Sequence, residues 1–157
     1  ASFTHLIIDL SKSYSLIDMA AIESASKVVL ITQLDLPCLR NVVRLMMSFE
    51  EMEELKDKVE IVVNRVGLDS GQISLKKAKE TLGREVFALL PNDYRTMVEV
   101  RNNGVPLIVQ APRAGITHAI RELAAKLDGA NQQRGEEADS TSKSSESKWK
   151  KFWPGTK

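Results

Sequence analysis

Four short runs of apolar, mostly β-branched residues recur along the chain, and helical patterns separate them. The runs occupy residues 5–9, 27–32, 59–63 and 86–90. Runs of this kind are typical of strands buried on both faces, and their alternation with helices favours parallel strands joined by βα crossovers. We therefore expect an α/β fold, doubly wound, with a mainly parallel sheet and helices on both faces.

Helical signals mark three segments between and after these runs. Apolar residues recur at spacings of three and four over residues 39–52, which predicts a long amphipathic helix. A serine is placed to begin a short helix over residues 74–83, and a glycine is placed to end it. A last apolar stripe over residues 116–127 predicts a further helix, and we expect the preceding residues 106–109 to be extended.

The composition changes at Asp128, where Gly, Asn, Gln, Ser, Thr and charged residues replace the large apolar ones. Such a segment buries too little apolar surface to offset the entropy cost of ordering. We therefore expect an α/β domain over residues 1–127, a flexible polar linker over residues 128–147, and an aromatic-basic tail over residues 148–157.

Composition limits the classes of function. A chain of 157 residues, 43% of them hydrophobic, is about the size of one domain. The 22 basic and 21 acidic residues leave a net charge of +1, so we do not expect a nucleic-acid partner. No apolar run is long enough to span a bilayer and no signal-peptide pattern is present, so we expect a cytoplasmic protein. Because the chain does not begin with Met, we expect it to be part of a larger protein.

Polar residues follow three of the expected strands, and the carboxyl ends of parallel strands meet at one edge of a sheet. Asp9 ends the first run and could hold Mg²⁺ through water, although it could equally cap the following turn. Asn64 and Arg65 end the third run, and an amide there could recognise a purine edge, although Asn also favours turns. The fourth run ends in the rigid turn Pro91, Asn92 and Asp93.

A phosphate-binding loop is missing from the sequence. The pattern G-x-x-x-x-G-K-[ST] supplies backbone N–H groups and a lysine to nucleotide phosphates, and the eight glycines of this chain never form it. On the nucleotide interpretation, the sequence carries the base and metal side of a site without its phosphate cradle; on the alternative, the same residues serve turns and caps.

Taken in order, the strand-ending motifs resemble those of the MinD/ParA deviant-Walker ATPases, and within that group most closely the CpaE/TadZ pilus-assembly proteins. The resemblance covers about residues 3–127. It is carried by the stretches Leu6–Asp9, Val28–Thr32, Val62–Arg65, Leu90–Asp93, Asn103–Leu107 and Ala111–Arg113.

The resemblance implies specific roles. Asp9 would be the Walker B acid, Asn64 would contact adenine, and the turn at residues 91–93 would border the base. ATP and Mg²⁺ would be cofactors of an intact parent protein, of which this chain would be the C-terminal portion without the N-terminal phosphate-loop unit. This chain alone would not hydrolyse ATP. Ser11 stands where family members often have a proline, which implies weakened or lost hydrolysis.

The resemblance also implies a cellular role. The chain would belong to a protein for pilus assembly or for localisation of a type IV-type secretion system, with assembly proteins as partners and a homodimer as its expected form. Three alternatives remain: a non-catalytic scaffold of the same fold, a chromosome or plasmid partitioning ATPase, and a phospho-receiver domain.

The aromatic-basic tail forms a second candidate site. Its aromatic residues recur at i, i+3 and i+4 among lysines, a pattern typical of helices that lie on anionic membranes, where each lysine contributes about 1 kcal/mol. Docking to a protein partner or to the domain itself is the alternative. On the membrane interpretation the protein is peripheral at the inner membrane face. The residues concerned are Trp149, Lys150, Lys151, Phe152 and Trp153.

Overall fold

The computed structural model of the chain describes residues 3–11, 15–52, 55, 57–68 and 71–138, the last nine of them by backbone alone. The chain divides into two compact units, residues 1–123 and 124–157. The expected tail lies outside the described residues. The division of the chain into domain, linker and tail stays a prediction.

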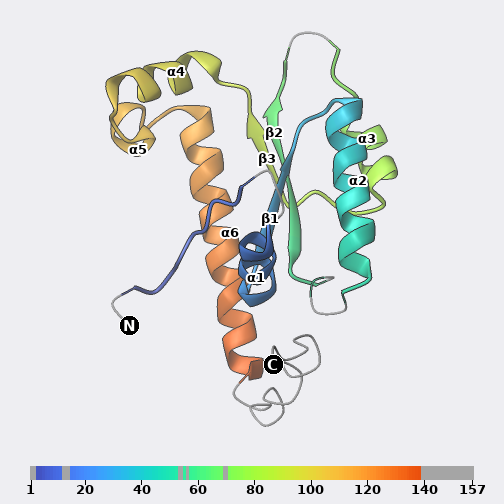
Figure 1. The fold of residues 1–157 in the computed structure, drawn as a ribbon. Coiled ribbons are helices and arrows are strands. Elements are labelled where there is room, and N and C mark those ends of the chain that lie inside the picture. The colour runs from blue at the N-terminus through green and yellow to red at the C-terminus, as the bar shows by residue number, and fades with distance from the viewer. Residues whose placement is uncertain (1–2, 12–14, 53–54, 56, 69–70, 139–157) are drawn as a thin grey trace. The chain divides into compact units, whose positions relative to one another are not determined.

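Along the described residues, helices and strands alternate over residues 16–103, and two further helices follow (Figure 1). They are α1 (Leu16–Ser24), β1 (Val28–Thr32), α2 (Leu36–Glu50), β2 (Val59–Val66), α3 (Leu75–Leu82), β3 (Ala88–Pro91), α4 (Tyr94–Asn103), α5 (Leu107–Gln110) and α6 (Gly115–Ala138). Among these residues, no helix combines the length and the apolar character that crossing a membrane requires.

The three strands form one parallel sheet in the order β1-β2-β3. Val28 of β1 pairs with Val59 of β2, and the register continues to Thr32 opposite Val63. Helices α2 and α3 provide the crossovers that parallel strands require. The expected α/β fold with a parallel sheet is confirmed.

Both faces of the sheet are covered, because alternate residues of β2 point to opposite sides. Val59, Ile61 and Val63 belong to one buried cluster, which also contains the apolar faces of α2 and α3. Val62 belongs to a second cluster with Ile116 of α6 and residues of β3. In Figure 1, α2 and the upper part of α6 accordingly lie on opposite sides of the strands. The doubly wound arrangement is confirmed.

Helix α2 forms where the apolar spacing predicts it. The Asp35 carboxylate accepts a hydrogen bond from the Cys38 N–H at 2.8 Å and so caps the helix, and Pro37 lies in its first turn. The side chains that face the sheet are Leu39, Val42, Met46 and Phe49.

The expected helix signals at residues 74–83 are confirmed by α3. The Ser74 hydroxyl accepts from the Lys77 N–H, and Gly83 ends the helix with a φ of 63°, a left-handed conformation that suits glycine. The buried face of this short helix consists of Ala78 and Leu82.

The expected strand at residues 5–9 is wrong. This segment is not part of the sheet, and Leu6 and Ile7 are 83% and 93% exposed. A strand needs a neighbouring strand for its backbone hydrogen bonds, and apolar composition alone cannot supply one. The sheet of the described residues ends at β1, where Ile31 is also exposed.

Two further differences concern the C-terminal third. Residues 106–109 were expected to be extended, but residues 107–110 form the single helical turn α5, in which the Pro106 carbonyl accepts hydrogen bonds from the N–H groups of Val109 and Gln110. Helix α6 continues to Ala138 and so includes the first residues of the expected linker. The Ala, Gln, Arg and Glu residues that dominate residues 130–138 are good helix formers, which favours this extension.

Candidate functional site

The carboxyl ends of β2 and β3 are joined directly. Val66 is paired with Pro91, and the Asn92 N–H donates to the Val66 carbonyl at 2.8 Å. The register of the two strands shifts between Val63 and Val66, so the residues between them form an irregularity at the end of β2. Two of the three polar strand ends that were expected to converge, those at Asn64 and Pro91, therefore meet at one edge of the sheet.

Asn64 and Arg65 occupy this irregularity. The Asn64 Oδ1 accepts from the Arg65 N–H at 2.8 Å, and Arg65 has a φ of 57°, the one positive φ found outside glycine in the described residues. Asn64 is half-buried and Arg65 is exposed. An amide oxygen has two lone pairs, so Asn64 keeps acceptor capacity for a ligand.

Gln72 holds the loop that follows, and the sequence patterns do not single it out. Its Oε1 accepts from the N–H groups of Gly67 at 3.0 Å and Leu68 at 3.1 Å, and its Nε2 donates to the Arg65 carbonyl at 2.8 Å. One amide side chain thus satisfies three backbone groups of the loop. A lone Gln in a Gly-rich segment carries no distinctive spacing, because its partners are set by the loop conformation.

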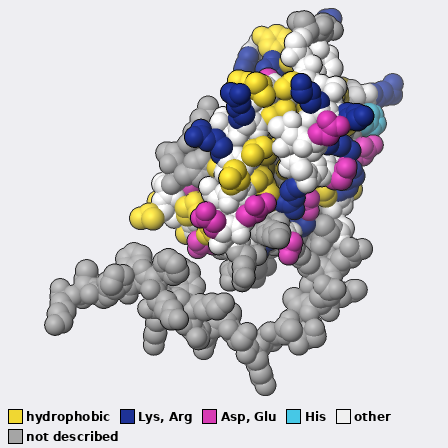
Figure 2. Space-filling model, turned by 90° about the vertical axis from the view of Figure 1, so that its right-hand side faces the viewer, with side chains coloured by type: hydrophobic (Ala, Val, Ile, Leu, Met, Phe, Trp, Pro, Cys, Tyr) yellow, Lys and Arg dark blue, Asp and Glu magenta, His cyan; other side chains and the backbone are white. Residues whose placement is uncertain are grey.

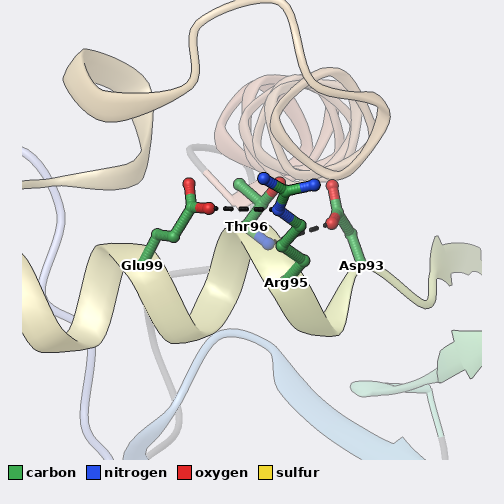
Figure 3. A network of polar contacts seen from close by, with 4 residues as sticks. All are labelled: Asp93, Arg95, Thr96 and Glu99. Carbon is green, nitrogen blue, oxygen red and sulfur yellow. Dashed lines mark hydrogen bonds and ion pairs between the residues drawn. The ribbon is translucent and has the colours of Figure 1, made fainter.

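The turn after β3 leads into α4, and Asp93 serves that helix. The Asp93 carboxylate accepts from the Thr96 N–H at 3.1 Å as the N-cap (Figure 3). The exposed pair Arg95–Glu99, 3.2 Å apart, lies one turn further along α4. Asp93 therefore contributes a structural cap, while Asn92 has its backbone at the edge of the sheet. Both residues are half-buried.

Asp9 is not brought to this edge as a strand residue. It lies in the exposed segment before α1 and outside the sheet. No group of three or more His, Cys, Asp or Glu side chains able to hold a metal ion occurs among the described residues. A magnesium role for Asp9 through water stays a prediction.

A carboxylate that the sequence analysis missed organises the segment after Asp9. Asp18 is buried, and its carboxylate accepts hydrogen bonds from the backbone and hydroxyl groups of Ser11 and Ser15 at 2.6–3.1 Å. The hydroxyls of Ser11 and then Ser15, with their backbone N–H groups, lower the pKa of Asp18 to about 2. Ser15 and Asp18 form a capping box at the start of α1, and its S-x-x-D spacing is the signal that could have revealed it.

Helices α2 and α3 form a different surface of the molecule. A hollow of about 510 Å³ is lined by Pro37, Arg40, Asn41, Val43, Arg44 and Thr81. Figure 2 shows this side of the molecule, where Lys and Arg side chains surround apolar ones in the upper part. The exposed apolar residues of α2 include Leu36 and Met47.

Comparisons with known proteins agree on the fold. No protein-family model matches the chain. It is 26% identical over 125 residues to an uncharacterized ATP-binding protein of Methanocaldococcus jannaschii, a match that covers 80% of this chain and 46% of that protein.

Among solved structures, a ParA family ATPase from Chlorobium tepidum has a TM-score of 0.64 at 22% identity, over 71% of this chain and 45% of that one. The MinD cell division protein of Aquifex aeolicus has a TM-score of 0.63 at 21% identity, over 74% and 50%. MinD of Pyrococcus horikoshii, solved with Mg-ADP, has a TM-score of 0.61 at 23% identity, over 73% and 46%.

The chain spans about half the length of the proteins it matches. These similarities concern the backbone arrangement: three parallel strands with helices on both faces. The chain has the α/β fold of the ParA/MinD ATPases.

Proposed function

We propose that this chain supplies the base-recognising edge of a nucleotide-binding domain. The observation that carries the proposal is the junction of β2 and β3, where the Asn92 N–H meets the Val66 carbonyl and places the Asn64 motif beside the Pro91 turn. Ligands of open α/β sheets bind at the carboxyl ends of the strands. The fold similarity to ParA/MinD ATPases and the ATP-binding relative support the same assignment.

In this proposal the Asn64 amide recognises adenine by a paired donor and acceptor, with Arg65 and the turn at Pro91, Asn92 and Asp93 along the rim of the base. These residues fit only the base of ATP and not its phosphates, because the 157 residues contain no phosphate-loop pattern. The phosphates and Mg²⁺ would be held by residues of an N-terminal unit outside this sequence, and Asp9 would act on the metal through water.

The finer identity that we propose is a CpaE/TadZ-like protein for pilus assembly or for localisation of a type IV-type secretion system. Its support is the set of sequence stretches that resemble that group. Its partners would be proteins of the secretion assembly and a second copy of the chain, and its location would be the inner membrane face.

Base recognition is tested with AMP and GMP, which differ only in the base. The ¹⁵N-labelled chain is titrated with each, and amide chemical shifts are followed. We expect AMP to shift the signals of Asn64, Arg65 and Asn92 more strongly than GMP does, and Asn64→Ala to remove this difference. The matched variant Asn41→Ala, on exposed α2, should retain it. Equal responses of the wild-type chain to both nucleotides would refute the proposed base site.

ATP hydrolysis is tested on the chain by itself. The chain should show no Mg²⁺-dependent ATP hydrolysis above background, because the phosphate cradle is missing from its sequence.

Membrane binding of the tail is tested in a vesicle sedimentation assay. The chain should bind anionic vesicles more than neutral ones. A version without residues 148–157 should bind neither, and equal sedimentation with and without the tail would exclude the membrane role.

A scaffold of the same fold is the second candidate, and the exposed apolar and basic surface of α2 favours it. A protein that recognises no base but still joins an assembly through this surface would fit that function. A partitioning ATPase would need salt-sensitive DNA binding, which the net charge of +1 does not favour.

A further inference from the structure

We infer that Gln72 is a positioning residue for base recognition: it holds Arg65 in its left-handed conformation and thereby sets where Asn64 and Arg65 lie. This inference rests on the proposed function, since it concerns the same edge of the sheet. Gln72 itself reaches that edge from the loop before α3, seven residues after Arg65.

The argument begins with Arg65. A φ of 57° is unfavourable for a residue with a Cβ, so neighbouring interactions must hold it there. Two amide side chains hold it, one through the N–H group and the other through the carbonyl group of Arg65. Asn64 Oδ1 accepts from the Arg65 N–H at 2.8 Å, and Gln72 Nε2 donates to the Arg65 carbonyl at 2.8 Å.

The orientation of the Gln72 amide is determined by its surroundings. Its oxygen faces two N–H donors, those of Gly67 and Leu68, and its nitrogen faces a carbonyl. A flipped amide would place donor against donor and acceptor against acceptor. The side chain is therefore bound in one orientation, and both ends of it act on the loop at residues 65–68.

Gln72 is in turn anchored to the rest of the sheet edge. The next residue, Ile73, donates its N–H to the carbonyl of Leu34 at 2.9 Å, just after β1, and Leu34 is buried. Hydrogen bonds thus run from the end of β1 through residues 72 and 73 to Arg65 at the end of β2. The bond from Asn92 to Val66 extends this series to β3. Within this series of hydrogen bonds, the Gln72 side chain is the one that contacts the Asn64–Arg65 motif.

The consequence is a specific division of roles. Asn64 contacts the base in the proposed function, whereas Gln72 contacts only backbone groups and acts through Arg65. Loss of the Gln72 side chain should let the peptide between Arg65 and Val66 rotate, and with it the Asn64 amide. Base discrimination should then fall although Asn64 is unchanged.

The test uses the full 157-residue chain and three variants. Gln72→Ala removes all three hydrogen bonds. Gln72→Glu keeps an acceptor for Gly67 and Leu68 but presents an oxygen to the Arg65 carbonyl at neutral pH, so it isolates the Arg65 contact. Gln110→Ala makes the same chemical change at an exposed position of α5 and is the matched control.

Two readouts separate positioning from general stability. The first is the nuclear Overhauser effect between the amide proton and the Hα of Arg65, which is strong when φ is positive. The second is the ratio of AMP to GMP affinity from amide shifts. We expect both Gln72 variants to weaken the Arg65 signal and to weaken AMP binding about tenfold, leaving GMP binding little changed. Gln110→Ala should match the wild type in both.

The outcomes are distinguishable. A wild-type chain without any preference for AMP overturns the proposed function and this inference with it. A wild-type chain that prefers AMP, with Gln72→Ala equal to it, overturns this inference alone. Equal loss of AMP and GMP affinity in Gln72→Ala also overturns it, because that pattern indicates general destabilisation.

Discussion

Ser11 donates two hydrogen bonds to the carboxylate of Asp18, one from its backbone N–H at 3.1 Å and one from its Oγ at 2.6 Å. With the two bonds from Ser15, they draw the segment after Asp9 onto the start of α1. All of these bonds are donated to the carboxylate, so they favour its ionised form, whose oxygens accept and do not donate.

Asp18 should make stability depend on acid pH. Its pKa is lowered from 3.8 to about 2 in the folded chain, so the carboxylate contributes stability above its unfolded pKa and loses this contribution as the pH falls towards 2. Asp18→Asn should be less stable than the wild type in urea unfolding at pH 7, and the difference should shrink at pH 3. The exposed change Glu80→Gln should produce no comparable convergence. A difference that stays constant from pH 7 to pH 3 would contradict this role.

The core should depend strongly on Leu39. This side chain is fully buried on the face of α2 that meets the sheet, so Leu39→Ala removes apolar contacts and leaves a cavity. We expect a loss of about 2–5 kcal/mol in the free energy of unfolding. Met47 of the same helix is 63% exposed, so Met47→Ala should change the free energy of unfolding by no more than about 0.5 kcal/mol. Urea unfolding of both variants measures the contrast, and similar losses would place the core elsewhere.

Gly83 should be required for its backbone conformation. An added Cβ would meet no atom within 4 Å, so the cost of Gly83→Ala comes from its φ of 63° alone. We expect a loss of about 1 kcal/mol and a lower melting temperature. Gly115→Ala has equally open space without the positive φ, and it should leave stability unchanged or raise it slightly. Equal effects of the two substitutions would show that φ does not determine the cost.

The positive φ of residue 65 should lower the free energy of unfolding for any residue with a Cβ. Arg65→Gly and Arg65→Ala both remove the charged side chain, so their difference isolates the effect of the positive φ. We expect the glycine variant to be more stable than the alanine variant by about 1–2 kcal/mol in urea unfolding. If the alanine variant is as stable as the glycine variant, residue 65 does not hold a left-handed conformation in solution.

Much of the fold follows from local patterns in the sequence. The β-branched runs at residues 27–32 and 59–63 became β1 and β2, and the apolar spacing from Leu39 onwards became α2. Ser74 and Gly83 marked the start and end of α3. These features depend on side-chain periodicity and capping within a few residues, which a sequence displays directly.

The sheet boundary and the candidate site were decided by tertiary structure. The run at residues 5–9 has a strand-like composition but lies exposed, because pairing requires a neighbouring strand that composition does not provide. Asn64 and the turn at Pro91 were visible in the sequence, whereas their junction through Val66 and Asn92 required the register of β2 against β3. Gln72 went unnoticed because its partners are backbone groups brought close by the loop conformation. Asp18 was missed although the S-x-x-D spacing of its capping box with Ser15 is present in the sequence. Local sequence patterns therefore determined β1, β2, α2 and α3, whereas tertiary hydrogen bonding decided which apolar runs pair in the sheet and which polar residues form one site.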